Sequence, residues 1–174
     1  MTLDMRLYCL LLSSEDGIST GRLNCYMYVF QKMGFKLDYS FRINVSGVRS
    51  KNFSRYLEEQ VSTGFLTQRK GIINLTSESR SVLERFILSY DELASSDRII
   101  EVLGSLSDDE LHLVCVTNII IEDVIKTKGV GALVDSRDFI EKSVSNLCSE
   151  YTKENFNLSV ALMQNLKKEC YLDD

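Results

Sequence analysis

The fold is decided by residues 37–76, LDYSFRINVSGVRSKNFSRYLEEQVSTGFLTQRKGIINLT, in which the hydrophobic period changes twice. Between residues 37 and 45, apolar side chains alternate with polar ones, and this alternation is typical of a half-buried strand. Gly47 follows closely, and a glycine at that point favours a turn. The first part of the stretch therefore predicts one strand that ends in a turn.

The second part of the stretch changes to helical spacing. From Lys51 to Ser62 the apolar side chains recur every three or four residues, and Ser50 stands where a helix N-cap is expected. Two short strands, FLTQ and IINLT, come next and are joined by the turn residues Arg69-Lys70-Gly71. The second part therefore predicts a helix followed by a β-hairpin.

The segments on either side of this stretch are expected to be helical. Apolar spacing predicts helices over about 4–12 and 20–33 before it, and a further helix over 78–93 after it. The expected inner face of the helix over 78–93 consists of Val82, Leu83, Phe86 and Tyr90.

The resulting order of elements is helix, helix, strand, helix, strand, turn and strand, which is the order of a winged helix. In this fold Lys51–Ser62 would be the recognition helix, and Arg69-Lys70-Gly71 would be the tip of the wing. We expect the strand over 37–45 to pair with the hairpin that forms the wing.

The polar residues 94–97 mark the expected boundary of the winged helix. Beyond them, Ser107 and Glu110 have the S-x-x-E spacing of a capping box. The helix that they open runs to about Lys128 and is apolar on almost every side, so it should be the buried centre of this half. Further helices are expected over 136–149 and 153–170.

The predicted fold is therefore mainly α with a small antiparallel β-hairpin or sheet. A winged helix-turn-helix domain is expected over residues 1–93, and an α-helical extension over residues 97–174 is expected to pack against it. The absence of proline from the chain suits a fold dominated by helices, because helix interiors exclude proline.

The composition is that of a folded protein without a membrane-spanning segment. Hydrophobic residues make up 44% of the 174 residues, which is enough for a core. No apolar run reaches the roughly 18 residues of a membrane helix, and the N-terminal segment lacks the basic region and cleavage site of a signal peptide. The five cysteines are odd in number and none forms C-x-x-C, so we expect reduced thiols in a cytoplasmic protein.

The net charge of −5 conceals a difference between the two halves. Residues 1–80 contain 11 Lys/Arg and 7 Asp/Glu, whereas residues 81–174 contain 9 Lys/Arg and 18 Asp/Glu. A basic first half and an acidic second half favour different partners for the two halves, although charge also varies along chains without any functional reason.

The sequence lacks the patterns of several catalytic and cofactor sites. Gly47 stands alone, whereas phosphate-binding loops need several glycines at fixed spacing. The single histidine, His112, lies on an apolar helix and is expected to be a core or interface residue, while zinc sites usually combine several His and Cys. No G-x-S-x-G motif exists. We therefore predict a non-enzymatic protein that requires no cofactor or metal.

Six residues form the candidate contact site of the winged helix. Four of them lie at the start of the expected recognition helix, where base contacts usually form, and two lie at the tip of the wing. Glu58 and Glu59 share the exposed side of this helix and would repel phosphates, so DNA and an acidic protein surface both stay open as partners. The candidate residues are Arg49, Lys51, Asn52, Arg55, Arg69 and Lys70.

A series of short motifs resembles known winged-helix proteins. The motifs LSDDELHLVCVTNI and YTKENFNLSVALMQNL of the second half contribute to the likeness. The residues of the first half that carry it are Phe41, Arg42, Gly47, Ser50, Leu57, Glu58, Glu59, Gly64, Phe65, Leu66, Leu75 and Thr76. With these motifs the chain resembles the YwgA-like and Panacea (SocA-type) winged-helix proteins. It is also similar in size and layout to the middle components of ABC-three-component defence systems, including the Lamassu type.

The resemblance implies a function that composition and spacing do not address. It implies an accessory or adaptor subunit of a bacterial antiviral defence or toxin–antitoxin module. The implied partner is a protein encoded nearby, such as an SMC-like ATPase, an effector or a toxin. A winged-helix transcriptional regulator that binds DNA is the alternative.

Overall fold

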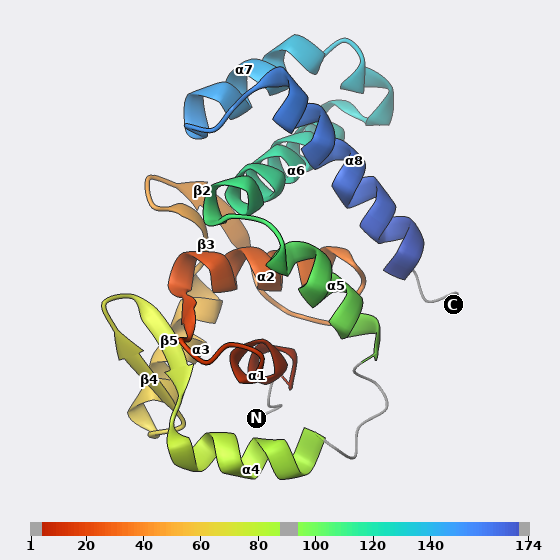
Figure 1. Ribbon diagram of the computed structural model, residues 1–174. Coiled ribbons are helices and arrows are strands. Elements are labelled where there is room, and N and C mark those ends of the chain that lie inside the picture. Colours follow the sequence, from red (N-terminus) through yellow and green to blue (C-terminus); the bar gives the residue numbers. More distant parts are fainter. Residues whose placement is uncertain (1–4, 88–93, 171–174) are drawn as a thin grey trace.

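The computed structural model describes residues 5–87 and 94–170, and most of these residues are helical (Figure 1). The elements of the first half are α1 (Met5–Leu12), β1 (Ile18–Ser19), α2 (Thr20–Lys32), β2 (Phe41–Asn44), β3 (Gly47–Ser50), α3 (Lys51–Ser62), β4 (Leu66–Arg69), β5 (Ile72–Leu75) and α4 (Ser77–Ile87). The second half contains α5 (Ala94–Gly104), α6 (Asp108–Lys128), the short 3-10 helix η2 (Val130–Leu133), α7 (Arg137–Leu147) and α8 (Lys153–Cys170). The prediction of a mainly α fold with a small antiparallel sheet is confirmed.

The winged helix consists of α1, α2 and α3 with a three-stranded antiparallel sheet in the order β1-β5-β4. The wing is the hairpin β4–β5, and its turn places Lys70 and Gly71 at positive φ. Glycine at position 71 adopts this backbone without the steric cost that a side chain would add. The strand β1 was not expected, because two residues show no period of their own; Ile18 and Ser19 become a strand by pairing with β5.

Residues 37–45 are the part of the fold that the sequence mispredicts. Burial alternates along residues 37–44 as expected, but only β2 is a strand. This strand pairs with β3 in a separate two-stranded sheet and not with the wing. The reason is that the chain reverses at Val45-Ser46, which makes β3 the neighbour of β2. Before β2, the side-chain amide of Gln31 bonds both backbone groups of Tyr39 in place of a partner strand.

Helix α3 is held by one buried stripe and leaves its other side exposed. The Ser50 hydroxyl accepts a hydrogen bond from the Phe53 backbone N–H, as the predicted N-cap. The buried Asn24 of α2 accepts a hydrogen bond from the Ser50 N–H and donates one to the Thr20 carbonyl, so the start of α3 is tied to the first turn of α2. The buried residues of α3 are Phe53, Leu57 and Gln60.

Helix α4 has a different inner face from the one expected. Leu83 is buried, whereas Val82 is 52% exposed. Ser79 and Leu83 lie one turn apart and form the buried stripe, so Val82 points away from the core. Residues 88–93, which include Tyr90, lie outside the described residues, as does the side chain of Phe86.

Helix α6 is the buried centre of the second half, as predicted. The predicted capping box is present: Ser107 Oγ accepts a hydrogen bond from the Glu110 N–H, and the Glu110 carboxylate accepts one from the Ser107 N–H. Helices α7 and α8 pack against α6 (Figure 1). In the described part of the chain, neither α6 nor another helix has the length and hydropathy of a membrane-spanning segment.

Helix α2 joins the two halves of the chain. It packs against α5 and α6, and the buried hydrophobic residues of both halves belong to one cluster. Arg22 pairs with Asp108 at 2.6 Å, and Lys32 pairs with Glu122 at 2.5 Å. The expected boundary residues 94–97 begin α5. The helical extension therefore packs on the winged helix through α2, and the division into two domains stays a prediction.

Candidate functional site

The six candidate residues lie on the surface, at the start of α3 and at the tip of the wing. Among the described residues, no ion pair includes any of their charged side chains, whereas Arg22, Lys32 and Arg137 are all paired. The charges of the candidate site are therefore available to a partner. Arg49 is half-buried, and the exposed members are Lys51, Asn52, Arg55, Arg69 and Lys70.

The sheet register adds Arg42 to this site. Strands β2 and β3 pair Arg42 directly with Arg49, and directly opposed like charges in a sheet repel each other. An anionic partner would relieve this repulsion. Pairing residues 37–45 with the wing leaves Arg42 out of the predicted site, and a short turn at Val45-Ser46 is the sequence signal that would place it opposite Arg49. The basic face is defined from here on as Arg42, Arg49, Lys51, Asn52, Arg55, Arg69 and Lys70.

A line of hydrogen bonds connects the two parts of the basic face through α2. At the wing, the Gly71 carbonyl accepts hydrogen bonds from the backbone N–H and the hydroxyl of Thr20. The Thr20 carbonyl in turn accepts one from Asn24, which also bonds the Ser50 N–H at the start of α3. The wing tip and the start of α3 are thus both anchored to the first turn of α2.

Carboxylates lie close to the basic face. Glu58 and Glu59 are exposed on α3 itself. Asp108 at the start of α6 accepts hydrogen bonds from Arg22 and from the Ser19 hydroxyl, next to the turn of α2 that holds the wing. The surface around the basic residues is therefore mixed in sign, and a polyanion would meet repulsion at its margins.

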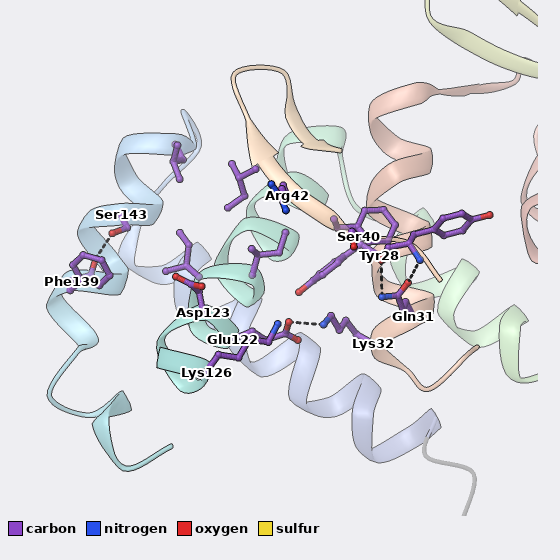
Figure 2. Close-up of a pocket in the computed structure, with 16 residues that line it drawn as sticks. Tyr28, Gln31, Lys32, Ser40, Arg42, Glu122, Asp123, Lys126, Phe139 and Ser143 are labelled. Atoms are coloured by element: carbon purple, nitrogen blue, oxygen red, sulfur yellow. Dashed lines mark hydrogen bonds and ion pairs between the residues drawn. The ribbon is translucent and has the colours of Figure 1, made fainter. Parts of the chain in front are cut away.

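A groove with a volume of about 580 Å³ lies between β2, α2, α6 and α7 (Figure 2). Arg42 and Ser40 lie on the β2 side, and Phe139 and Ser143 lie on α7 across from them (Figure 2). No residue of β3 is among the described residues that line the groove. The volume is within the usual range of ligand-binding clefts, about 300–1,000 Å³.

The floor of the groove contains a polar network between α2 and α6. Lys32 pairs with Glu122 (Figure 2). Asn118 donates hydrogen bonds to Glu122 and to the Tyr28 hydroxyl. Burial, followed by the nearby charge of Glu122, raises the pKa of Tyr28 far above its usual value. The Tyr28 phenol therefore stays protonated, and the network fixes α2 against α6 below the groove.

Burial holds two thiols and the histidine in their neutral forms. Burial raises the pKa of the Cys148 thiol to about 11 and raises that of Cys115 as well. A nucleophilic cysteine needs the opposite shift. Burial lowers the pKa of His112, partly opposed by Asp109, and its buried Nε2 has no hydrogen-bond partner among the described residues. His112 is half-buried and lies next to Gly47, and its assignment as a core or interface residue stays a prediction.

No protein-family model matches the chain, and no curated protein or solved structure matches it either. The resemblance to YwgA-like, Panacea and ABC-three-component proteins therefore stays a prediction. The basic face and the groove are the features of the described residues that bear on function.

Proposed function

We propose that this protein is a non-enzymatic winged-helix adaptor that binds a partner protein through its basic face. The observation that supports this function best is a set of exposed or half-exposed cations without ion pairs in the described part of the chain. An acidic surface of a partner would neutralise them. The motif resemblance suggests a bacterial defence or toxin–antitoxin module as the setting, with the partner encoded nearby and both proteins in the cytoplasm.

A protein partner fits this surface better than a bare phosphate backbone does. Glu58 and Glu59 on α3 would face phosphates, and the whole chain carries a net charge of −5. Winged helices that bind DNA strongly are usually much more basic. A protein partner can place lysines or arginines opposite Glu58 and Glu59 and carboxylates opposite the cations.

DNA binding is the second candidate, and one observation favours it. The exposed side of α3 faces away from its own buried stripe, and its basic first turn and the basic wing tip are anchored to the same turn of α2. A transcriptional regulator would place α3 in a groove of the DNA and the wing tip on the neighbouring phosphates.

The experiment is a comparison of two double variants. We would co-express the tagged chain with its neighbouring genes and replace Lys51 and Arg55 by alanine. The matched control replaces Lys142 and Lys168, two exposed lysines of the second half. Loss of a stoichiometric partner in the first variant alone supports the adaptor.

The same variants separate the two candidate functions. If the isolated wild-type chain binds its own promoter, and Lys51→Ala with Arg55→Ala lowers the salt dependence by about one log–log unit per phosphate contact, the regulator is correct. If the first double variant keeps its full partner binding, the basic face is not the contact surface and the proposed adaptor mechanism is wrong.

A further inference from the structure

The groove opens along the free edge of β2. Five consecutive residues, 39–43, line it, although their side chains alternate between the two faces of the chain. A strand contributes consecutive residues to one cavity when its edge faces that cavity. Because β3 covers the other edge of β2 and contributes no described lining residue, the groove lies on the unpaired side of the strand.

The backbone at this edge lacks a partner. Strand β2 has β3 as its single neighbour in the two-stranded sheet. Within the described residues, no backbone hydrogen bond joins residues 41–44 to any element other than β3. In an antiparallel pair, alternate residues direct N–H and C=O away from the partner strand, so β2 presents a row of free donors and acceptors to the groove.

The α7 side of the groove contributes two exposed apolar side chains beside Ser143. Helix α7 buries Ile140 and Val144 on one face. Phe139 and Leu147 lie beside this buried stripe, are both exposed and both line the groove. The half-buried residues Ile119 and Ile120 of α6 form the apolar part of the floor.

We propose that an extended segment of the partner protein binds in this groove as an additional antiparallel or parallel strand on β2. This inference rests on the proposed adaptor function and locates a second contact of the partner. The segment's backbone pairs with the free edge, and alternate side chains pack on Ile120 and Phe139. A helix is the poorer occupant, because it would cover the apolar wall and leave the edge of β2 unpaired.

Charge specifies the segment further. Arg42 on β2 and Lys126 on α6 border the groove, and neither forms an ion pair with a described residue. Asp123 is the one carboxylate among the groove residues without such a pair, since Glu122 is bonded to Lys32. Two cations against one anion favour a segment in which apolar residues alternate with acidic or polar ones.

The test uses the isolated chain and a displayed library of random short peptides as the probe. Selected peptides are synthesised and titrated against wild type, Phe139→Glu and Val82→Glu. Phe139 is 58% exposed and Val82 is 52% exposed, so the two variants alter similarly exposed side chains inside and outside the groove. We expect the selected peptides to alternate apolar and acidic residues. Phe139→Glu should weaken their binding about tenfold or more, as for loss of an anchoring contact, whereas Val82→Glu should leave their affinity unchanged.

A second measurement identifies strand pairing. Single backbone amides of a selected peptide are N-methylated in turn. Methylation should abolish binding at every other position and be tolerated at the positions between, because only alternate amides donate to β2. Sensitivity at every position, or at helical spacing, would overturn the strand. Selection of no peptide above the Phe139→Glu background would overturn the groove as a docking site.

A second copy of this chain is the competing occupant of the groove. A concentration-dependent dimer that Phe139→Glu dissociates would assign the groove to that second copy and overturn a partner's segment as its occupant. The library test needs no neighbouring gene, so its failure can be distinguished from failure of the proposed adaptor function. The adaptor function fails if the partner still co-purifies fully with the Lys51/Arg55 variant.

Discussion

Helices α3 and α6 both begin at a serine N-cap, but their surroundings differ. In α6 the buried positions include every residue from Leu113 to Asn118, so the helix is enclosed on almost every side there. In α3 the buried residues form one stripe, and Lys51, Asn52 and Arg55 are exposed. Burial therefore constrains the sequence of α6 at nearly every position of its centre, whereas on α3 it leaves the outer side free to serve a partner.

The largest expected effect is that of a charge in α6. Val114→Asp places a carboxylate at a position that is buried among apolar side chains, and we expect a loss of at least about 3 kcal/mol in the free energy of unfolding. Asn52→Asp on the exposed side of α3 should change it by less than about 0.5 kcal/mol. Urea unfolding of both variants measures the difference. Wild-type stability of Val114→Asp would show that α6 is not the buried centre.

A smaller difference is expected between the two N-caps. Ser50 is buried, so Ser50→Ala leaves the Phe53 N–H without water or a side-chain acceptor and should cost about 1–2 kcal/mol. Ser107 is exposed, and water can replace its hydroxyl in Ser107→Ala, for which about 0.5–1 kcal/mol is expected. Thermal unfolding of the two variants provides the comparison. Equal losses would mean that burial of the cap has no effect here.

The single histidine, His112 on α6, should make the stability of the chain depend on pH. Burial lowers the folded-state pKa of His112 below its usual value of 6.5, so the unfolded chain takes up a proton first on acidification. Stability is then complete above about pH 6.5 and is lost as the pH falls through the lowered pKa. Unfolding between pH 7.5 and 5 should show this slope in wild type and a reduced slope in His112→Gln. Identical slopes in the two proteins would exclude His112 as the cause.

The smallest expected effect is that of removing charges from α3. Lys51→Ala with Arg55→Ala should change the free energy of unfolding by no more than about 0.5 kcal/mol, because both side chains are exposed and unpaired among the described residues. Calorimetry of the double variant checks this. A clearly lower Tm would mean that the outer side of α3 contributes to folding, and loss of partner binding could no longer be assigned to contact alone.

The features that local chemistry determines were predicted from the sequence. Ser50 and Ser107 cap the helices that they were expected to cap, and the turn at Lys70-Gly71 forms the expected wing. Each depends on residues close together in the chain, so its signal is present in a short window.

The features that distant contacts determine were not predicted. Strand β1 exists through its pairing with β5, and the neighbour of β2 follows from where the chain reverses. Val82 was placed inward because α4 alone does not reveal that the buried stripe passes through Ser79. Arg42 and the groove are not predicted either: Arg42 joins the basic face through the pairing of β2 with β3, and the groove depends on how β2 lies relative to α6 and α7.

Buried thiols at the contact between α2 and α6 can be used to measure how often this contact opens. The Cys115 thiol donates to the Cys25 carbonyl, and both side chains are buried, as is Cys148. A disulfide reagent can reach the sulfurs of Cys25 and Cys115 only while α2 and α6 are apart, so the labelling rate gives the free energy of that opening. With Cys9, Cys148 and Cys170 replaced by serine, labelling of these two thiols measures how often the helical extension separates from the winged helix. Partner binding that clamps the two halves together would slow this reaction.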